Sequence, residues 1–280
     1  DPRHPMQNRF KGIFAPGSSL KPIIAAIGLS QNKFSASDDF GNSGKRWQKN
    51  KSWGGYYVTT LHDYSGHNVR NALIYSDNIY FAKAALKIGK DTLKDQFDNL
   101  LFGKNLDFTF GLTASSYGSE GFTSEIQLAD SGYGQGEMMV NPVHMATIYT
   151  AFSNKGNMLK PYLIKQKGSK KQVLKEHVFS NDAVKTVNDA MKQVISNPNG
   201  TGHAAQIDGI DLKGKTGTAE IKQSQTDTKG TELGWFVTIM PKTEYKESLE
   251  LVSMTENVKK RGGSGYVVNK TKKIIEEYLQ

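Results

Sequence analysis

The sequence predicts an α+β fold, in which an antiparallel sheet is flanked by helices and joined to an all-helical lobe. Two observations lead to this prediction. Three β-rich segments follow one another near the C-terminus, at about 212–221, 232–240 and 248–257, and such neighbours pair as antiparallel strands. Segments with helical periodicity come before and after them, so helices can cover both faces of the sheet.

The expected helices show apolar residues at helical spacing and turn-forming residues at their ends. The first helix covers residues 19–29, directly after Pro16 and Gly17. Pro22 is tolerated in it because the first turn has backbone donors without helical partners. We expect the following segment, 67–101, to be mainly helical. Further helices are expected over about 141–154, 180–197 and 264–279.

The remaining segments are interpreted as loops and short strands. Residues 34–66 are loop-rich, and 102–136 form a lid region rich in glycine and serine. Strands are expected near 161–166 and 172–178, and the basic run 165–171 is typical of a hairpin turn. We expect a single domain over residues 1–280, since a chain of this length can bury a large core.

Composition excludes several kinds of site. The chain has no cysteine, so it has no disulfide, thiol nucleophile or cysteine–zinc site. Its six histidines show no metal-ligand spacing, and we predict neither a metal nor a cofactor. The net charge of +9 suits attraction to an anionic polymer or membrane surface, but no nucleic-acid-binding motif accompanies it. The longest apolar run, residues 22–29, is too short to span a membrane.

The first of three short motifs places Ser18 at a helix N-terminus and Lys21 one turn later on the same face. A serine hydroxyl is a poor nucleophile until a neighbouring base takes its proton. Lysine can be that base only if burial or nearby positive charge lowers its pKa. Alone the pair is uninformative, because serine is a common N-cap and lysine a common surface residue. A second copy, Ser30 to Lys33, lies where the helical pattern ends, and we assign it no catalytic role.

The second motif is Ser76-Asp77-Asn78, expected on a short loop between helices so that the side chains of Ser76 and Asn78 face one cleft. The serine hydroxyl could relay a proton between Lys21 and a leaving group. The asparagine amide could orient Lys21 and bind a substrate carbonyl. The alternative is an ordinary N-cap, with Ser76 or Asp77 opening the next helix.

The third motif lies in the segment 215–221, whose β-branched residues are typical of a strand. Lys215, Thr216 and Thr218 offer a positive charge and two hydroxyls to a substrate carboxylate. A glycine inside a strand marks a bulge or a close backbone approach, and we expect a substrate backbone to be the close neighbour of Gly217. The alternative is an edge-strand glycine beside solvent-exposed lysines.

With these motifs in this order, the chain resembles the transpeptidase domain of class B penicillin-binding proteins. More narrowly, it is similar to their low-affinity, β-lactam-resistant subgroup in Gram-positive bacteria. The resemblance covers nearly the whole chain. Beyond the motifs it rests on 8–10, 15–18, 44–56, 128–137, 141–142, 200–205 and 234–236.

The resemblance implies a peptidoglycan D,D-transpeptidase that cross-links stem peptides through a serine acyl-enzyme and is acylated by β-lactams. Catalytic roles are implied for Ser18 (nucleophile), Lys21 (base), Ser76, Asn78 and Lys215, and substrate-binding roles for Thr216, Gly217, Thr218, Tyr133 and Gln135. Other cell-wall synthesis proteins are further expected partners. The expected location is the extracellular face of the cytoplasmic membrane. The anchor, a pedestal region and the first sheet strands of such proteins are expected to precede this chain.

Other functions of the same fold remain as alternatives. They are a β-lactam sensor domain, a D,D-carboxypeptidase and a β-lactamase. A class A β-lactamase needs a glutamate that activates a deacylating water, and the nearest match is Glu125, with Ala129 where that family has asparagine. The segments 44–56 and 128–142 resemble cell-wall enzymes rather than sensors. His203 follows a glycine-rich loop expected near the site, without a catalytic role.

Overall fold

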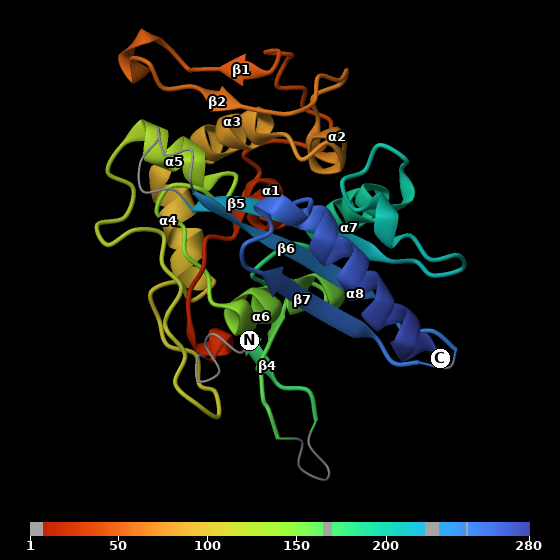
Figure 1. Ribbon diagram of the computed structural model, residues 1–280. Helices are drawn as coiled ribbons and strands as arrows, with labels where there is room; N and C mark the ends of the chain where they lie inside the picture. The colour runs from red at the N-terminus through yellow and green to blue at the C-terminus, as the bar shows by residue number, and fades with distance from the viewer. Residues whose placement is uncertain (1–7, 165–169, 222–229, 245) are drawn as a thin grey trace.

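The computed structural model describes residues 8–164, 170–221, 230–244 and 246–280. Within them the chain folds around a three-stranded antiparallel sheet, in the order β5–β6–β7. These strands are Lys213–Ile221, Thr231–Met240 and Leu249–Thr255. In Figure 1, helix α8 (Ser264–Leu279) crosses one face of the sheet, and most other helices gather on the opposite side. The predicted α+β fold is confirmed.

Strand β6 is buried on both faces of the sheet, which explains its nearly continuous apolar sequence. Phe236 and Met240 pack with residues of α8 in one apolar cluster. Val237 and Ile239, which point the other way, pack with the helical lobe in the main core. The sheet therefore separates two apolar clusters, and its edge strand β5 carries the third motif beside the lobe.

The helical lobe holds α1 at its centre. The remaining helices of this lobe surround it or extend it away from the sheet. The α-helices are α1 Lys21–Ser30, α2 Val69–Ile74, α3 Asn78–Ile88, α4 Lys90–Asn99, α5 Glu125–Ser131, α6 Pro142–Ser153 and α7 Asn181–Ser196. Short 3-10 turns are η1 Arg9–Lys11, η2 Gly17–Leu20, η3 Lys51–Trp53, η4 His203–Ala205 and η5 Lys259–Arg261.

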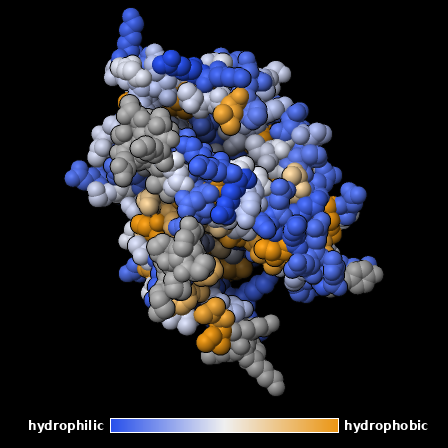
Figure 2. Space-filling model, viewed as in Figure 1, coloured by the Kyte–Doolittle hydropathy of each residue, from blue (hydrophilic) through white to orange (hydrophobic). Residues whose placement is uncertain are grey.

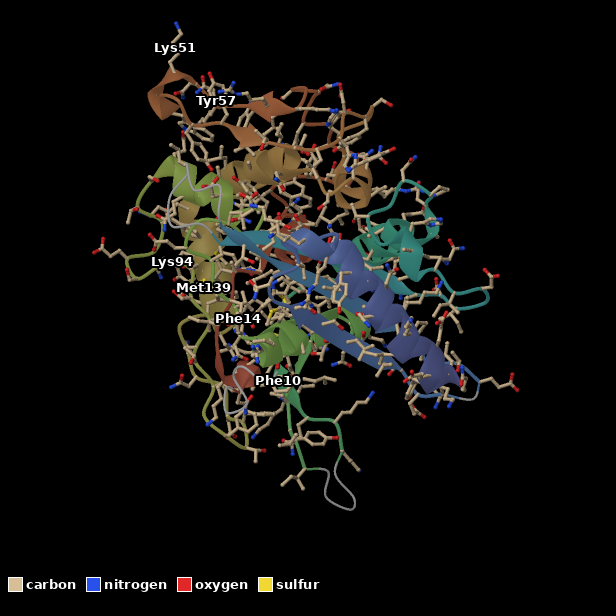
Figure 3. The ribbon with its side chains drawn as sticks, viewed as in Figure 1. Phe10, Phe14, Lys51, Tyr57, Lys94 and Met139 are labelled. Carbon is tan, nitrogen blue, oxygen red and sulfur yellow. The ribbon has the colours of Figure 1, made fainter. Side chains whose placement is uncertain are left out.

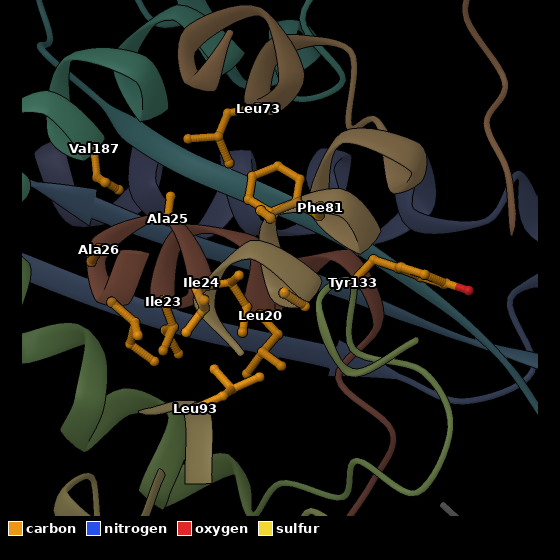
Figure 4. Packing of buried hydrophobic residues seen from close by; sticks show 14 of the residues in the cluster. Leu20, Ile23, Ile24, Ala25, Ala26, Leu73, Phe81, Leu93, Tyr133 and Val187 are labelled. Carbon is orange, nitrogen blue, oxygen red and sulfur yellow. The ribbon is translucent and has the colours of Figure 1, made fainter. Parts of the chain in front are cut away.

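Helix α1 is apolar on all sides because it is enclosed by other elements. Figure 4 shows Leu20, Ile23 and Ile24 packed against Leu93 and other core side chains. The three residues are completely buried. Each such side chain contributes about 1.5–3 kcal/mol through the removal of apolar surface from water. The residues that begin this helix are therefore held in a tightly packed environment.

Capping side chains begin several helices where the sequence places polar residues. Asn141 accepts hydrogen bonds from the backbone N–H groups of Val143 and His144 at the start of α6. Ser180 accepts one from Ala183 at the start of α7. Such caps satisfy backbone donors that have no partner inside the helix. The helices predicted over 141–154, 180–197 and 264–279 are confirmed to within a residue or two.

Two short hairpins lie outside the main sheet. β1 (Arg46–Trp47) pairs with β2 (Val58–Thr59), and β3 (Met158–Leu159) pairs with β4 (Val173–Lys175). The strand predicted at 161–166 is wrong over its described residues, 161–164. Pro161 explains this, because it has no N–H to donate to the ladder. Most of the predicted turn at 165–171 lies outside the described residues.

The predicted lid region, 102–136, contains a helix that the sequence analysis did not assign. Helix α5 has only seven residues, and Ser124 caps it by accepting from the N–H of Gln127. A helix this short shows too few periodic positions to be distinguished from a loop. In the part of the chain that the structure describes, no helix has the length and apolarity needed to cross a membrane.

Candidate active site

All three motifs contribute to one cleft of about 910 Å³, between the sheet, the helical lobe and the β1–β2 hairpin. Its lining includes Ser18, Ser76, Asn78, Thr216, Thr218, Tyr133 and Gln135. Lys21 and Lys215 lie behind this lining, because both are completely buried. The structure thus brings residues from four distant parts of the sequence together.

Ser18 lies in the 3-10 turn η2, which leads directly into α1. Gly17, before it, has a φ of +52°, and a Cβ there would come within 2.5 Å of the Thr218 carbonyl oxygen. Gly134, with a φ of +73°, accepts a hydrogen bond from the N–H of Gly17 at 3.0 Å, and a Cβ on it would lie 2.1 Å from the Gly17 oxygen. Only glycine fits such positions. The turn η2, called the serine turn below, is therefore held between the backbone at Thr218 and the backbone at Gly134.

Gly217 on β5 has a different close neighbour from the one predicted. A Cβ at this position would lie 2.9 Å from both the Pro16 carbonyl oxygen and the Ser19 nitrogen. The serine turn itself therefore requires glycine here, whereas the sequence analysis expected a substrate backbone. The correction has a simple cause, since the packing of η2 on β5 brings together residues 200 positions apart that no local pattern relates.

The ammonium nitrogen of Lys21 is bound by the second motif. It donates to the carbonyl oxygen of Ser76 and to Oδ1 of Asn78, both at 2.7 Å, and lies 3.3 Å from Ser76 Oγ. Burial lowers the pKa of Lys21 well below its usual value, and the positive charge of Lys215 lowers it further. The nearby Asp77 carboxylate opposes this shift. Burial and the charge of Lys215 thus favour the neutral amine of Lys21.

Lys215 approaches the same serine from the sheet. Its Nζ donates to Ser76 Oγ at 2.8 Å and to the carbonyl oxygen of Thr216 at 3.1 Å. Burial lowers the pKa of Lys215 to about 7. The hydroxyl of Ser76 therefore lies between two amines.

The backbone around Ser76 is strained and tightly fixed. Its φ is +54°, in the left-handed region that residues other than glycine rarely adopt. Asp77 follows as the N-cap of α3: its Oδ1 accepts from the N–H of Ile79 at 2.8 Å, and its Oδ2 accepts from Tyr64 at 2.7 Å. Asn78 is the first residue of α3 rather than a loop residue. The ordinary capping role and the second motif are thus combined in one turn.

These sequence and structural features agree with a comparison against known families. The family model of the penicillin-binding protein transpeptidase domain matches residues 1–276. The chain belongs to this family. The resemblance drawn from the motifs is thereby confirmed at family level, while the narrower low-affinity subgroup stays a prediction.

Individual relatives of this transpeptidase domain are longer proteins. Penicillin-binding protein 3 of Bacillus subtilis (strain 168) is 40% identical over 275 residues, which make up 98% of this chain and 41% of that protein. The peptidoglycan D,D-transpeptidase FtsI of Escherichia coli (strain K12) is 28% identical over 222 residues, or 78% of this chain and 36% of that protein. The chain therefore spans less than half the length of these two relatives.

Solved structures share the fold at lower identity. PBPA from Mycobacterium tuberculosis has a TM-score of 0.83 and 18% identity, covering all of this chain and 64% of that one. The transpeptidase domain of penicillin-binding protein 3 from Burkholderia pseudomallei has a TM-score of 0.79 and 20% identity, covering 96% and 82% of the two chains. At these identities the likeness supports the fold alone.

Thr201 is a cleft residue of this transpeptidase domain that the motif analysis missed. Its hydroxyl accepts a hydrogen bond of 2.7 Å from the hydroxyl of Thr216. Both side chains line the cleft. The sequence signals were the glycine on either side of Thr201 and the place of 200–205 in the family resemblance, which indicated a loop near the site but not the contact with Thr216.

A buried carboxyl group connects two walls of the transpeptidase cleft. Asp130 on α5 accepts hydrogen bonds from the hydroxyls of both Tyr56 and Tyr133. Burial raises the pKa of this carboxyl, while the two tyrosine hydroxyls partly oppose the change. Tyr133 and Gln135 line the rim as predicted from the resemblance, but Tyr56 and Asp130 were not proposed individually.

Two other residues weighed in the sequence analysis lie outside the transpeptidase cleft lining. The Nδ1 atom of His203 lies 2.9 Å from the Ile195 carbonyl oxygen, and its side chain lines a separate surface cavity. His203 itself does not line the cleft, because η4 directs its side chain towards α7, although Thr201 in the loop before it does. Glu125 binds Lys49 and accepts from Nε1 of Trp53 at 2.8 Å. It does not contribute to the cleft lining.

Proposed function

We propose that this domain cross-links peptidoglycan stem peptides through an acyl-enzyme on Ser18 and is acylated by β-lactams at the same atom. The observation that supports this most directly is the shared hydroxyl of Ser76, bound by both Lys21 and Lys215 within the cleft that Ser18 lines. A serine mechanism with a lysine base needs this set of groups at one point.

In the first half-reaction, neutral Lys21 takes the proton of the Ser18 hydroxyl. Ser18 Oγ then attacks the carbonyl carbon of the penultimate D-Ala, and the amide C–N bond breaks. The backbone N–H groups of Ser18 and Thr218 stabilise the oxyanion, as such donors do in other acyl-transfer sites. The departing D-Ala nitrogen receives the proton from Lys21 through the Ser76 hydroxyl.

In the second half-reaction, the amine of a neighbouring stem peptide attacks the ester carbon. A new amide bond forms, the ester C–O bond breaks, and Ser18 regains its proton. Before the first cleavage, Thr216 and Thr218, with Lys215 behind them, hold the terminal carboxylate of the donor peptide, which leaves with the departing D-Ala. A β-lactam follows the first half-reaction, but its leaving group stays tethered, and the acyl-enzyme persists.

The substrate also determines where the domain works. Peptidoglycan is assembled outside the cytoplasmic membrane, so we place the active site at the extracellular face of that membrane. Other cell-wall synthesis proteins are the expected partners there. The net charge of +9 favours approach to an anionic wall polymer at low ionic strength.

The pairing of Glu125 argues against a hydrolytic β-lactamase. A deacylating base must contact a water beside the ester, whereas Glu125 is bound to Lys49 and Trp53 away from the cleft lining. Its pKa is lowered by the hydrogen bond from Lys49 and then by that from Trp53. This environment suits a structural ion pair. A sensor or a carboxypeptidase would share the first half-reaction and differ in the fate of the ester.

The test is intact mass spectrometry after incubation with benzylpenicillin, with peptide mapping and a time course. We expect one stable adduct on the peptide that contains Ser18, and none on Ser18→Ala. An adduct on the variant at the same peptide would refute the nucleophile. Rapid drug consumption without a lasting adduct would indicate a hydrolase.

A second assay separates the remaining functions. A donor peptide ending in D-Ala-D-Ala is incubated with an amine acceptor, and the products are resolved by mass. A cross-linked product supports a transpeptidase. Release of D-Ala without cross-linking identifies a carboxypeptidase, and a drug adduct without either product identifies a sensor.

A further inference from the structure

The β1–β2 hairpin contributes side chains to the cleft that none of the three motifs includes. Arg46 on β1 is the register partner of Thr59 on β2, and both line the cleft together with Tyr57. The amide nitrogen of Asn78 donates to the Thr59 carbonyl oxygen at 2.9 Å, which ties the hairpin to the second motif. In Figure 1 the hairpin lies above α3, so Arg46 belongs to a wall close to the catalytic residues.

Arg46 is held by an aromatic ring. Its guanidinium carbon lies 3.6 Å from the centroid of the Tyr57 ring. Stacking uses the flat face of the guanidinium and leaves the N–H groups at its edge available to a ligand. The ring also restricts the rotamers of the arginine, so less entropy is lost when an anion binds. Arg46 is therefore a pre-oriented cation rather than a freely moving one.

The charge of Arg46 has no acidic partner within the described residues. Lys49 on the same hairpin differs, because it forms an ion pair with Glu125. The Asp130 carboxyl in the cleft accepts hydrogen bonds from the hydroxyls of Tyr56 and Tyr133. In Figure 2 the surface over the hairpin is mainly hydrophilic. The geometry leaves the guanidinium edge open to an anion that enters with the substrate.

We propose that Arg46, stacked on Tyr57, binds a second carboxylate of the acyl donor, on the N-terminal side of the bond that is cleaved. This inference rests on the proposed function, in which Thr216 and Thr218 hold the terminal carboxylate. The ligand class is an acyl donor with an anionic group upstream of the reacting carbonyl, whether a stem peptide or a β-lactam. Arginine suits this role because its planar fork matches a carboxylate with two parallel hydrogen bonds.

The experiment compares two penicillins that differ by one carboxylate. Benzylpenicillin lacks a side-chain carboxylate and carbenicillin carries one, so the ratio of their second-order acylation rate constants reports on that group. We expect Arg46→Gln to lower the carbenicillin to benzylpenicillin ratio by about fivefold, since the pair is partly exposed to water. Arg46→Lys keeps the positive charge but lacks the planar guanidinium. Its carbenicillin to benzylpenicillin ratio should fall between those of the unmodified protein and Arg46→Gln.

Lys51→Gln is the matched control. It removes one positive charge from the same hairpin, but Figure 3 shows Lys51 pointing away from the molecule, and it does not line the cleft. We expect its ratio to equal that of the unmodified protein. An unchanged ratio in Arg46→Gln, or an equal fall in Lys51→Gln, would overturn the proposal. Absence of acylation by either drug in the unmodified protein would instead refute the proposed function, and the Arg46 site with it.

Discussion

Lys21 and Lys215 are 194 positions apart in the sequence, and both donate to the hydroxyl of Ser76, at 3.3 and 2.8 Å. Both amines are completely buried. Two ammonium groups this close in a medium of low dielectric repel each other, so at least one of them is favoured as the neutral amine. We therefore expect the charge state of this pair, rather than that of either lysine alone, to set the pH range in which the proposed mechanism operates.

Replacement of Lys21 by alanine should slow acylation by benzylpenicillin about 10²–10⁴-fold, the usual effect of removing a general base. The rate constant can be measured by mass spectrometry. Lys33→Ala is the matched control, because Lys33 follows Ser30 as Lys21 follows Ser18, yet unlike Lys21 it is not buried. Equal rates for Lys21→Ala and the unmodified protein would exclude Lys21 as the base.

The pH dependence of acylation should respond to Asp77. In the proposed mechanism acylation requires neutral Lys21, so the rate should rise with pH as this lysine loses its proton. The Asp77 carboxylate stabilises the ammonium and raises the pKa of Lys21. Asp77→Asn removes that charge but keeps an oxygen that can cap α3. The midpoint of the pH–rate profile should therefore move to lower pH. A midpoint that stays in place or rises would contradict this electrostatic role.

Replacement of Lys215 by methionine should stabilise the fold while abolishing function. Burial lowers the pKa of Lys215 to about 7, so below pH 7 the folded state holds an ammonium that prefers water. The resulting loss of folding stability is at its full size below the pKa of Lys215 in the folded state. It disappears as pH rises to the pKa of lysine in the unfolded state, about 10.4. Lys215→Met should raise the free energy of unfolding at pH 6 by about 1–3 kcal/mol, after allowance for lost hydrogen bonds. Urea denaturation at pH 6 and pH 10 measures this, and a gain that is larger at pH 10 would show the wrong sign.

Gly134→Ala should damage the serine turn. Its Cβ would lie 2.1 Å from the Gly17 oxygen, so the loop or the turn must shift, and we expect acylation to fall at least about tenfold because the reacting groups are displaced. Gly209→Ala is the matched control, since Gly209 has a similar φ of +75° but open space around it. This control should lose about 1 kcal/mol of stability and no acylation rate. Equal effects of the two substitutions would mean that backbone strain, not the collision, is responsible.

Much of the fold follows from local patterns in the sequence. The helix α8 matches its predicted range, and strands β5, β6 and β7 begin and end within two residues of the expected positions. Helical and strand periodicity are local properties, so they can be identified without knowledge of the tertiary fold. Helix α5 was missed, and the strand predicted at 161–166 was wrong over its described residues, because short elements depend on their neighbours for stability.

The candidate site likewise has parts that follow from local sequence patterns and parts that depend on tertiary packing. The sequence by itself determined that Ser18 and Lys21 lie three residues apart at the start of one helical segment and that Lys215, Thr216 and Thr218 lie on a strand, because neighbours in a regular element have fixed spacing. Only the tertiary structure decided that Ser76 lies between two lysines, since contacts between residues far apart in the sequence come from packing.

Packing also decided the surroundings of the motifs. It placed Thr201 beside Thr216 and turned His203 away from the cleft. It packed the turn that carries Ser18 against Gly217, and it brought Arg46 to the cleft wall. The motif residues could be named in advance because each motif is contiguous in sequence. Their neighbours could not, because burial and close approach depend on how the sheet, the lobe and the hairpin fit together.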